Sequence, residues 1–511
     1  MNTAMQAPEA GIALKQDEDA RGGVCKDLIL LLGLAAVFRL AFLIVMPRVI
    51  DSADAIHYVG VARLFVLGEF QNFDGTIPVL YPLLSAAAAL VAPDMEWAGR
   101  LVSLIAGILL IAPVYLLARL MHGRKSAFVA GLIAALWPWL ADYACRVGPE
   151  ALASALWFSA LYALVRMMRG EHIWLLVAPL LFFLVHLVRP EGTFHLLAAP
   201  VFALILVEHG KRAAMRRLVP YIAIAAGLLI AHALFMKFAL GEATISYRLR
   251  DPAGTLRFLF VRRGVEAVRT FRATLSNVLP VMLGPYLLIF AGVGIFHRSV
   301  WKRDGRIELM VTAFALLQWL MAIVSTWPEP RYMMNVIIVV SLWSARGLVI
   351  VTHEAASSPS FRRFRHVPVS GMAALMLLGT ILTVAPEYMG RVPLEPREYK
   401  FAGQWMKANL EPGLIITRKP QVGFYADMPT LGPAPTDSVQ DAIARGMEAG
   451  AKYLVVDERY TAQIAPALKA LLDPANAPPE LRLLRADLSP YPQARLVIYA
   501  FDAGPALDPA P

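Results

Sequence analysis

The feature that most restricts the fold of this chain is a series of long apolar segments separated by short polar loops. The candidate membrane spans are residues 28–46, 97–121, 126–140, 151–168, 174–188, 193–207, 218–238, 278–296, 308–326, 332–351 and 369–386. The chain has 511 residues, of which 58% are hydrophobic. Because about 20 residues of helix cross a bilayer core roughly 30 Å thick, these runs predict an α-helical polytopic membrane protein with about eleven transmembrane helices. Residues 81–92 are apolar but shorter, and we expect them to lie along the membrane surface.

Basic residues in the loops predict the orientation of the spans. They cluster in alternate loops, at Arg124/Lys125, Arg166/Arg169, Lys211/Arg212/Arg216/Arg217, Arg298/Lys302/Arg303/Arg306 and Arg362/Arg363/Arg365. Cytoplasmic loops carry an excess of lysine and arginine, so these loops are expected on the cytoplasmic side. The N-terminal tail, residues 1–26, is then cytoplasmic, and the membrane domain covers 27–386 with outer loops at 47–96 and 239–277. No small-residue cleavage site follows the first span, which we expect to remain as an anchor.

The net charge of +10 does not indicate nucleic-acid binding. Most of it lies in the short loops, where it sets topology, and we expect no nucleic-acid partner. The two cysteines, Cys25 and Cys145, are expected on opposite sides of the membrane and cannot form a disulfide with each other. They also lack the spacing of metal ligands, so they leave the redox compartment open.

Beyond Glu387 the pattern changes to that of a small α/β domain. Helices are expected at 399–409, 438–449 and 462–472, and strands at 414–417, 453–456, 481–484 and 496–501. This alternation predicts an α/β domain over residues 387–503, outside the membrane. The domain has neither a phosphate-binding Gly-Lys-Ser loop nor a dinucleotide glycine fingerprint. Residues 504–511 are expected to form a disordered tail.

Two carboxylates directly follow the first span, in the sequence from Asp51 to Tyr58. An acid deep in the bilayer is costly, so we expect these acids at a water-filled edge and regard them as candidates for function. If Asp54 opens a helix, Asp54, His57 and Tyr58 share one face at spacings i, i+3 and i+4. That face would present a base, a titratable partner and a phenol to one cleft. The competing interpretation is that Asp51 or Asp54 caps the helix.

A second unusual feature is an arginine-rich outer segment, residues 241–280. Its arginines are Arg248, Arg250, Arg257, Arg262, Arg263, Arg269 and Arg272, mixed with apolar residues. A basic outer segment runs against the topology bias, and arginine forms bidentate hydrogen bonds with phosphate. Two interpretations stay open. The segment anchors the protein to anionic headgroups, or it forms a dedicated lipid-phosphate site, for which the candidates are Arg248, Arg250, Arg262, Arg263 and Arg269.

Further polar residues fall on the same predicted side of the membrane. They are Glu150 after Pro149, Arg189 and Glu191 in an Arg-Pro-Glu-Gly turn, and Arg331 and Tyr332 at the start of a span. Each also has a purely structural explanation, because Pro-Glu starts helices well, a polar turn can separate two helices, and a boundary arginine can snorkel. Their common side indicates one substrate cavity.

The histidines do not suggest a metal centre. His57, His186 and His195 are not spaced as ligands, and a single histidine inside a membrane span is more often a packing residue. We expect no cofactor and no required metal, although the sequence leaves a divalent cation open.

The first outer loop resembles that of the polyprenyl-phosphate-sugar-dependent glycosyltransferases, the GT-C superfamily, which includes protein O-mannosyltransferases and the lipid A aminoarabinose transferase. The loop reads Asp54-Ala-Ile-His57-Tyr58-Val-Gly-Val-Ala62-Arg63-Leu64. Similarity continues in Tyr81-Pro82-Leu83, Arg100-Leu-Val-Ser103, Tyr115-Leu-Leu-Ala118-Arg119, Glu150, Arg189-Pro-Glu-Gly192 and Arg331-Tyr332, and so covers nearly the whole chain. The chain departs at Ala55, where the family often has a second acid. It also lacks the large all-β insertion of the eukaryotic protein O-mannosyltransferases, which favours a bacterial lipid- or glycan-modifying branch.

The resemblance implies transfer of one sugar from a polyprenyl-phosphate donor to a hydroxyl of a lipid, glycan or protein acceptor. Asp54 matches the family's catalytic aspartate and is implied to be the general base of an inverting reaction. The outer arginines would stabilise the phosphate, and the substrate cavity would be lined by His57, Tyr58, Glu150, Arg189, Glu191, Arg331 and Tyr332. The implied setting is the bacterial inner membrane and its lipids, with the N-terminus cytoplasmic and the C-terminal domain periplasmic.

Two other classes of protein compete with this interpretation. One is a transporter or flippase of lipid-linked sugars, and the other is an O-antigen-ligase-like transferase that moves glycan chains. The lack of internal repeats and the position of the acids at the membrane surface argue against a transporter. The sequence does not identify the sugar, the acceptor or the carrier length.

Overall fold

The computed structural model describes residues 7–46, 49–206, 211–241, 264–297, 305–325, 329–357, 369–391, 395–486 and 494–502. The chain divides into two compact units. We call the first, Met1–Val45 with Ala62–Tyr388, the membrane unit, and the second, Met46–Val61 with Met389–Pro511, the C-terminal unit. Helix α2 (Ala53–Leu67) begins in the C-terminal unit and ends in the membrane unit.

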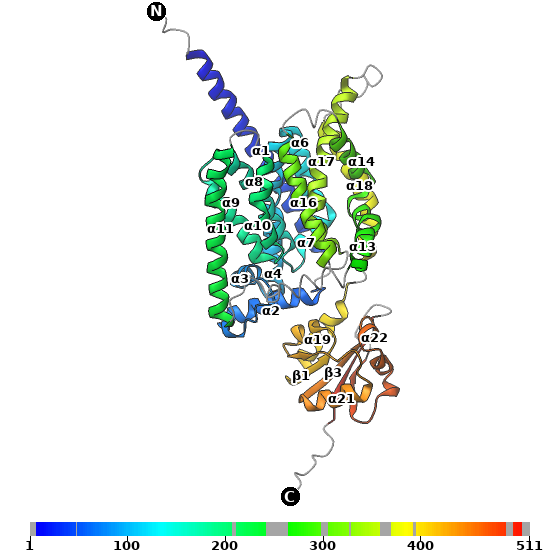
Figure 1. Ribbon diagram of the computed structural model, residues 1–511. Helices are drawn as coiled ribbons and strands as arrows, with labels where there is room; N and C mark the ends of the chain where they lie inside the picture. The colour runs from blue at the N-terminus through cyan, green and yellow to red at the C-terminus, as the bar shows by residue number, and fades with distance from the viewer. Residues whose placement is uncertain are drawn as a thin grey trace, which may run out of the picture. The chain divides into compact units, whose positions relative to one another are not determined.

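The membrane unit contains only helices in the residues that the structure describes (Figure 1). Its α-helices are α1 (Ala7–Val45), α3 (Leu80–Ala88), α4 (Met95–Leu109), α5 (Ile111–His122), α6 (Arg124–Leu136), α7 (Pro138–Cys145), α8 (Glu150–Met168), α9 (Trp174–Val188), α10 (Gly192–Ala203), α11 (Lys211–Leu240), α13 (Gly264–Ala273), α14 (Leu279–Phe296), α16 (Arg306–Ser325), α17 (Pro330–Ser357) and α18 (Val369–Arg391). Short 3₁₀ segments lie at Phe70–Asn72 and Leu204–Leu206, and a π-helical turn lies at Thr274–Val278. Helix α3 is the short apolar helix predicted near residues 81–92.

Most of the predicted spans correspond to helices of sufficient length and hydropathy. Among the described residues, seven helices can cross a membrane, namely Gly23–Val45, Met95–His122, Glu150–Met168, Ala214–Leu240, Glu266–Phe296, Arg306–Ile323 and Pro330–Ala355. The bent pair α6–α7 would add an eighth. Shorter apolar helices, Trp174–Val188, Gly192–Leu206 and Gly371–Thr383, occupy the other three predicted segments. The polytopic helical fold is confirmed, and the count of eleven spans stays a prediction.

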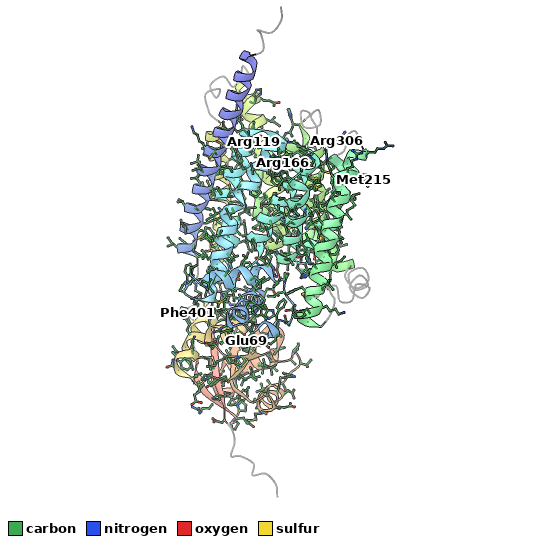
Figure 2. All side chains as sticks on the ribbon, turned by 90° about the vertical axis from the view of Figure 1, so that its left-hand side faces the viewer. Glu69, Arg119, Arg166, Met215, Arg306 and Phe401 are labelled. Atoms are coloured by element: carbon green, nitrogen blue, oxygen red, sulfur yellow. The ribbon has the colours of Figure 1, made fainter. Side chains whose placement is uncertain are left out.

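Several basic helix ends lie at one end of the membrane unit. Arg119 and Arg166 lie in the last turns of α5 and α8, and Arg306 begins α16. Figure 2 shows these three arginines at one end of the unit and Glu69 at the other. Glu150 opens α8, whose 19 residues make a rod about 28 Å long, so Glu150 lies at the end opposite Arg166. The basic helix ends thus gather on one side, as the alternation of basic loops requires.

A buried arginine stabilises the break between α6 and α7. A residue before proline avoids the helical conformation, so Trp137, which precedes Pro138, is extended, and the two helices are bent by 53°. Arg39 of α1 is fully buried and donates from Nη1 to Ala135 O at 2.8 Å and from Nη2 to Ala134 O at 3.1 Å. These carbonyls at the end of α6 have lost their helical partners, and in a membrane they need another donor.

The C-terminal unit is a small α/β domain joined by residues 46–61. Its elements are α19 (Arg397–Asn409), β1 (Leu414–Thr417), α20 (Pro420–Ala426), β2 (Thr430–Leu431), α21 (Val439–Glu448), β3 (Ala451–Asp457), α22 (Thr461–Ile464), the 3₁₀ helices Pro466–Leu472 and Pro474–Asn476, β4 (Leu481–Arg485) and β5 (Leu496–Phe501). The strand order is β2-β1-β3-β5-β4, with β1 parallel to β2 and β3, and β5 antiparallel to β3 and β4.

Alternate strand residues build a separate core on each face of this sheet. Ile415 and Val455 pack with residues of α19 and α20, whereas Ile416 and Val456 pack with α21 and the 3₁₀ helix that follows α22 (Figure 1). This period of two is the signature of strands covered on both faces.

The predicted elements of this domain have counterparts in the structure, with one change of type and two omissions. Residues 462–472, predicted as one helix, form the four-residue α22 and a 3₁₀ helix that begins at Pro466, where the ring removes a backbone donor. Helix α20 and strand β2 were not predicted, because seven and two residues are too few to show a hydrophobic period. The predicted tail, 504–511, lies outside the described residues.

Candidate functional site

A cavity opens among α8, α9, α10, α16 and α17 of the membrane unit. Five residues that the sequence analysis selected line it, namely Glu150, Arg189, Glu191, Arg331 and Tyr332. They come from three turns that are far apart in the sequence, and the fold brings all five together. The cavity lies at the first turn of α8, away from the basic end of the unit.

Arg189 faces both carboxylates of this cavity. Its Nη1 lies 3.5 Å from Glu150 Oε1, and its Nε lies 3.7 Å from Glu191 Oε2. The side chains of Glu150 and Glu191 are only 7% and 12% exposed. Removing carboxylates from water is costly unless a cation faces them, so this arginine offsets the charge of two largely buried acids.

Two arginines approach the ring of Tyr332. The guanidinium carbons of Arg189 and Arg331 lie 5.1 and 5.0 Å from the ring centroid, within the range of a cation–π interaction. Arg331 also pairs with Glu329, from Nε to Oε2 at 2.6 Å. Stacking on an aromatic ring holds the planar fork of arginine in place, which suits it to bidentate recognition of an anionic oxygen group.

Buried hydroxyl groups fix the turn that leads into Glu150. The amide of Gly148 donates to Tyr81 Oη at 2.8 Å, and Ser103 Oγ donates to Gly148 O at 2.9 Å. The Tyr81 hydroxyl in turn donates to Gly99 O at 2.8 Å. Burial raises the pKa of Tyr81, so the phenol keeps the proton that this bond needs. Tyr81 and Ser103 belong to motifs that carried the family resemblance, and their role here is to hold the Glu150 turn.

A buried arginine holds the other end of the same turn. Arg100 of α4 donates from Nη1 to Cys145 O at 2.7 Å, the last residue of α7, and pairs with Glu96 from Nε to Oε1 at 3.0 Å. Arg100 and Glu96 are 2% and 4% exposed. The backbone from Cys145 to Gly148 is therefore anchored at both ends before α8 begins.

The turn that carries Arg189 and Glu191 is tight because Gly192 follows it. A Cβ at Gly192 would overlap the backbone of His186, so only glycine lets α9 and α10 approach this closely. The amide of Gly192 donates to Arg189 O at 2.9 Å and closes the turn. The Arg-Pro-Glu-Gly sequence therefore separates α9 from α10, and it also places two charged side chains in the cavity.

Asp54, His57 and Tyr58 lie in the first two turns of α2, in the part that belongs to the C-terminal unit. Asp54 and His57 are exposed, and Tyr58 is buried. The helix is capped by Ser52, whose Oγ accepts from the amide of Ala55 at 3.1 Å. The alternative that Asp51 or Asp54 is the cap is wrong, because Ser52 occupies that position and Asp54 lies inside the first turn.

The arginine-rich segment is described only in its second half. Arg269 is exposed on α13, beside Val268 and Phe271, which are also exposed apolar residues. This pattern fits a helix that lies among lipid and headgroups. The other candidates, Arg248, Arg250, Arg262 and Arg263, lie outside the described residues.

Several polar residues of the cavity were not assigned to a substrate site from the sequence. They are Ser154, His195, Gln318 and Asn335, with the ring of Trp157 beside them. His195 is 1% exposed, and neither of its ring nitrogens has a hydrogen-bond partner among the described residues. Each lies within or at the end of a predicted span, where a polar side chain is itself a signal of function.

The chain is similar to one known protein family and to several solved membrane-protein structures. Residues 76–236 match the model of a family described as dolichyl-phosphate-mannose-protein mannosyltransferase. None of the curated protein sequences matches the chain. The apo structure of ArnT from Cupriavidus metallidurans has a TM-score of 0.61 at 15% identity, covering 94% of this chain and 98% of that one.

Two further structures are similar. ArnT bound to undecaprenyl phosphate has a TM-score of 0.60 at 15% identity, covering 93% of this chain and 99% of that one. The apo oligosaccharyltransferase of Archaeoglobus fulgidus has a TM-score of 0.60 at 13% identity, covering 88% of this chain and 72% of that one. At such identities the likeness establishes the fold. The chain therefore shares the fold of these membrane proteins, as the resemblance seen in the sequence implied.

Proposed function

We propose that this protein is an inverting glycosyltransferase that moves one sugar from a polyprenyl-phosphate donor to an acceptor hydroxyl. The observation that supports this most strongly is the cavity that gathers Glu150, Arg189, Glu191, Arg331 and Tyr332. Its acids suit the hydroxyl groups of a sugar, and its arginines suit a phosphate. An apolar helix bundle has no packing reason to bury such a set of charges.

The phosphate of the donor would be held by arginine. In the reaction the bond between the anomeric carbon and the phosphate oxygen breaks, and negative charge grows on the departing phosphate. Fixed cations at that point lower the barrier, because they are aimed where charge develops. Arg331, stacked on Tyr332, is the candidate in the cavity. The outer arginines Arg248, Arg250, Arg262, Arg263 and Arg269 remain candidates for the same role.

The general base would be Asp54, which the family resemblance selects. Its carboxylate takes the proton of the acceptor hydroxyl while the acceptor oxygen attacks the anomeric carbon from the face opposite the phosphate. The new glycosidic bond then has inverted configuration. A general base of this kind contributes about 10²–10⁴-fold to the rate. Asp54 and the residues of the cavity belong to different units of the chain.

We place the reaction at the outer face of a bacterial inner membrane. The basic helix ends gather at one end of the membrane unit and Glu150 lies at the other. Under the rule that basic loops stay in the cytoplasm, the cavity then opens outside the cell, where the C-terminal domain would also lie. The acceptor would be a lipid, a glycan or a protein at that surface.

The proposal is tested with purified protein in liposomes. The substrates are a panel of undecaprenyl-phosphate hexoses and pentoses, radiolabelled in the sugar, with an extract of membrane lipids and glycans as acceptor. We expect one labelled product of inverted anomeric configuration. Asp54→Asn should lower its rate of formation by about 10²–10⁴-fold while donor binding is retained. The matched control is Asp94→Asn, because Asp94 caps α4 by accepting from the Trp97 amide at 2.8 Å, and asparagine caps equally well.

Three results would overturn parts of this proposal. Unchanged turnover of Asp54→Asn would remove Asp54 as the base. Movement of labelled donor across the liposome membrane with no product would favour a flippase. Transfer of preassembled glycan chains, but not of single sugars, would favour an O-antigen-ligase-like enzyme.

A further inference from the structure

The C-terminal unit holds the backbone that leads into the helix of Asp54. The amide of Ile50 donates to Tyr425 Oη at 2.8 Å, and Gln421 Nε2 donates to Asp51 O at 3.4 Å. Ile50 is 1% exposed and Gln421 is fully buried. These are contacts between a segment that follows the first membrane helix and a domain that begins more than three hundred residues later. Both partners belong to one compact unit.

Both holding side chains come from one face of α20. Gln421 and Tyr425 are four residues apart in a seven-residue helix, so they project from the same side. The contacts fall on consecutive residues, and Ser52, the next in sequence, caps α2 through Ala55. A single residue, Ala53, then separates the cap from Asp54. The first turn of α2 therefore directly follows the backbone segment that Tyr425 and Gln421 bond.

Helix α20 is itself tightly fixed within the C-terminal unit. A Cβ at Gly403 of α19 would lie 2.5 Å from Val422 O and 2.6 Å from Tyr425 Cβ, so the two helices are in backbone contact. On the β2 side, a Cβ at Gly423 would overlap Thr430 Cγ2. With neighbours this close on two sides, α20 cannot shift without moving the domain core.

We infer that Tyr425 and Gln421 are positioning residues for Asp54, so that the C-terminal unit takes part in the chemical step through the 50–54 segment. This inference rests on the proposed function of Asp54 as the general base. A base must lie within hydrogen-bond reach of the acceptor hydroxyl, and its direction is set by the helix that carries it. The two side chains fix where that helix begins.

The inference predicts an effect on turnover and not on substrate affinity. Tyr425→Phe removes the acceptor of the Ile50 amide and keeps the Cβ that lies beside Gly403 and the ring that lies under Lys400 Nζ. We expect kcat to fall about tenfold, because a shift of roughly 1 Å in a reacting group costs up to about 10²-fold. KM for the undecaprenyl-phosphate sugar should stay within about twofold of wild type. Gln421→Met, which keeps the volume and removes the donor, should act in the same direction.

Tyr453→Phe is the matched control. Its hydroxyl also bonds a backbone group of the same unit, donating to Glu411 O at 2.9 Å, and neither partner belongs to residues 46–61. The same atom is removed, and one hydrogen bond between a tyrosine hydroxyl and the backbone is lost in each variant. If kcat falls equally in Tyr425→Phe and Tyr453→Phe, the loss reflects general destabilisation of the domain, and the inference is wrong.

A double-mutant cycle separates positioning from the proposed role of Asp54. In an Asp54→Asn background, Tyr425→Phe should cause no further loss, because there is no base left to position. Full additivity of the two losses would overturn the inference. If Asp54→Asn alone has no effect, the proposed function of Asp54 fails instead, so the two failures are distinct.

Hydrogen exchange tests the same inference without a substrate. Peptides that cover the first turns of α2 should exchange faster in full-length Tyr425→Phe than in wild type and in Tyr453→Phe. The cap made by Ser52 stays in all three proteins, so a faster exchange reports the loss of the Ile50 anchor. Equal exchange in all three proteins would show that the anchor does not hold α2.

Discussion

Replacing Gly148 by alanine tests whether the position of the Glu150 carboxylate matters for the reaction. A Cβ at Gly148 would overlap Glu150 Oε2, whereas Glu150 Cδ would lie at 3.4 Å, an ordinary contact distance. The backbone cannot give way easily, because Tyr81 and Ser103 hold the amide and the carbonyl of Gly148. We therefore expect the end of the Glu150 side chain to move while the backbone of the turn keeps its conformation.

The expected loss of rate follows from the small displacement of the Glu150 carboxylate. Relieving the overlap takes a displacement of about 1 Å of one carboxylate oxygen, and a misplacement of that size in a reactive geometry costs up to about 10²-fold in rate. The cost in folding stability should be about 1 kcal/mol, the lower end for overpacking, since the neighbour is the flexible end of a side chain. Activity and stability are thus expected to respond very differently.

The assay compares initial transfer rates and thermal unfolding for wild type, Gly148→Ala, Gly227→Ala and Glu150→Gln in the same detergent. Gly227→Ala is the control, because a Cβ at Gly227 in α11 meets nothing within 4 Å. It should leave turnover unchanged and gain about 0.5–1 kcal/mol from higher helix propensity. If Gly148→Ala keeps the wild-type rate while Glu150→Gln loses it, the positional argument is refuted. If neither loses activity, Glu150 is not part of the site.

Three other perturbations follow from buried or paired groups. Arg39→Met should lower the stability of the membrane unit by about 1–3 kcal/mol for each carbonyl left without a donor at the α6–α7 break, measured by thermal unfolding in detergent. Lys419 is half-buried, and burial and neighbouring cations lower its pKa, so it should react faster with an amine reagent near neutral pH than the exposed Lys452, as peptide mass spectrometry would show. The hydrogen bonds from Arg445 lower the pKa of Asp437, so Asp437 adds stability above the unfolded-state value of about 3.8 and loses it as pH falls through the lower folded value. Asp437→Asn should therefore lower the unfolding temperature at pH 7, and the difference from wild type should shrink only below about pH 3.8.

The sequence predicts which cavity residues share one side of the membrane, but it does not predict how they contact one another. The alternation of basic loops put Glu150, Arg189 and Arg331 on one side of the membrane, and the structure has them around one cavity. Sidedness follows from charge counting along the chain. Which helices become neighbours depends on packing between distant segments. The distance between Arg189 and Glu150, and the position of Arg189 over the Tyr332 ring, could therefore not be predicted from the sequence.

The contacts that hold the backbone before Asp54 could not be predicted from the sequence either, for a different reason. The prediction placed the acid at the start of a helix, and that helix exists as α2. The competing interpretation gave the cap to Asp51 or Asp54 and did not consider Ser52, although serine caps helices as well as aspartate does. Choosing among them requires knowing where the backbone turns. That turn is set by α20 of the C-terminal unit, which is too short to be seen in the sequence.

Two of the arginines buried in the membrane unit, Arg39 and Arg100, answer the same structural need. To bring Glu150 to the cavity, the chain leaves the helical conformation twice, once between α6 and α7 and again after Cys145. Each departure exposes backbone groups that lipid cannot satisfy. Arg39 bonds the carbonyls at the first break, and Arg100 bonds Cys145 O at the second. The thiol of Cys145 bonds Arg39 O at 3.3 Å and so links the two arginines through α7. A purely apolar bundle would need none of these groups, but it would also have no irregular turn from which a carboxylate could face a sugar. The buried arginines are therefore part of the structural basis of the proposed site, although neither of them lines its cavity.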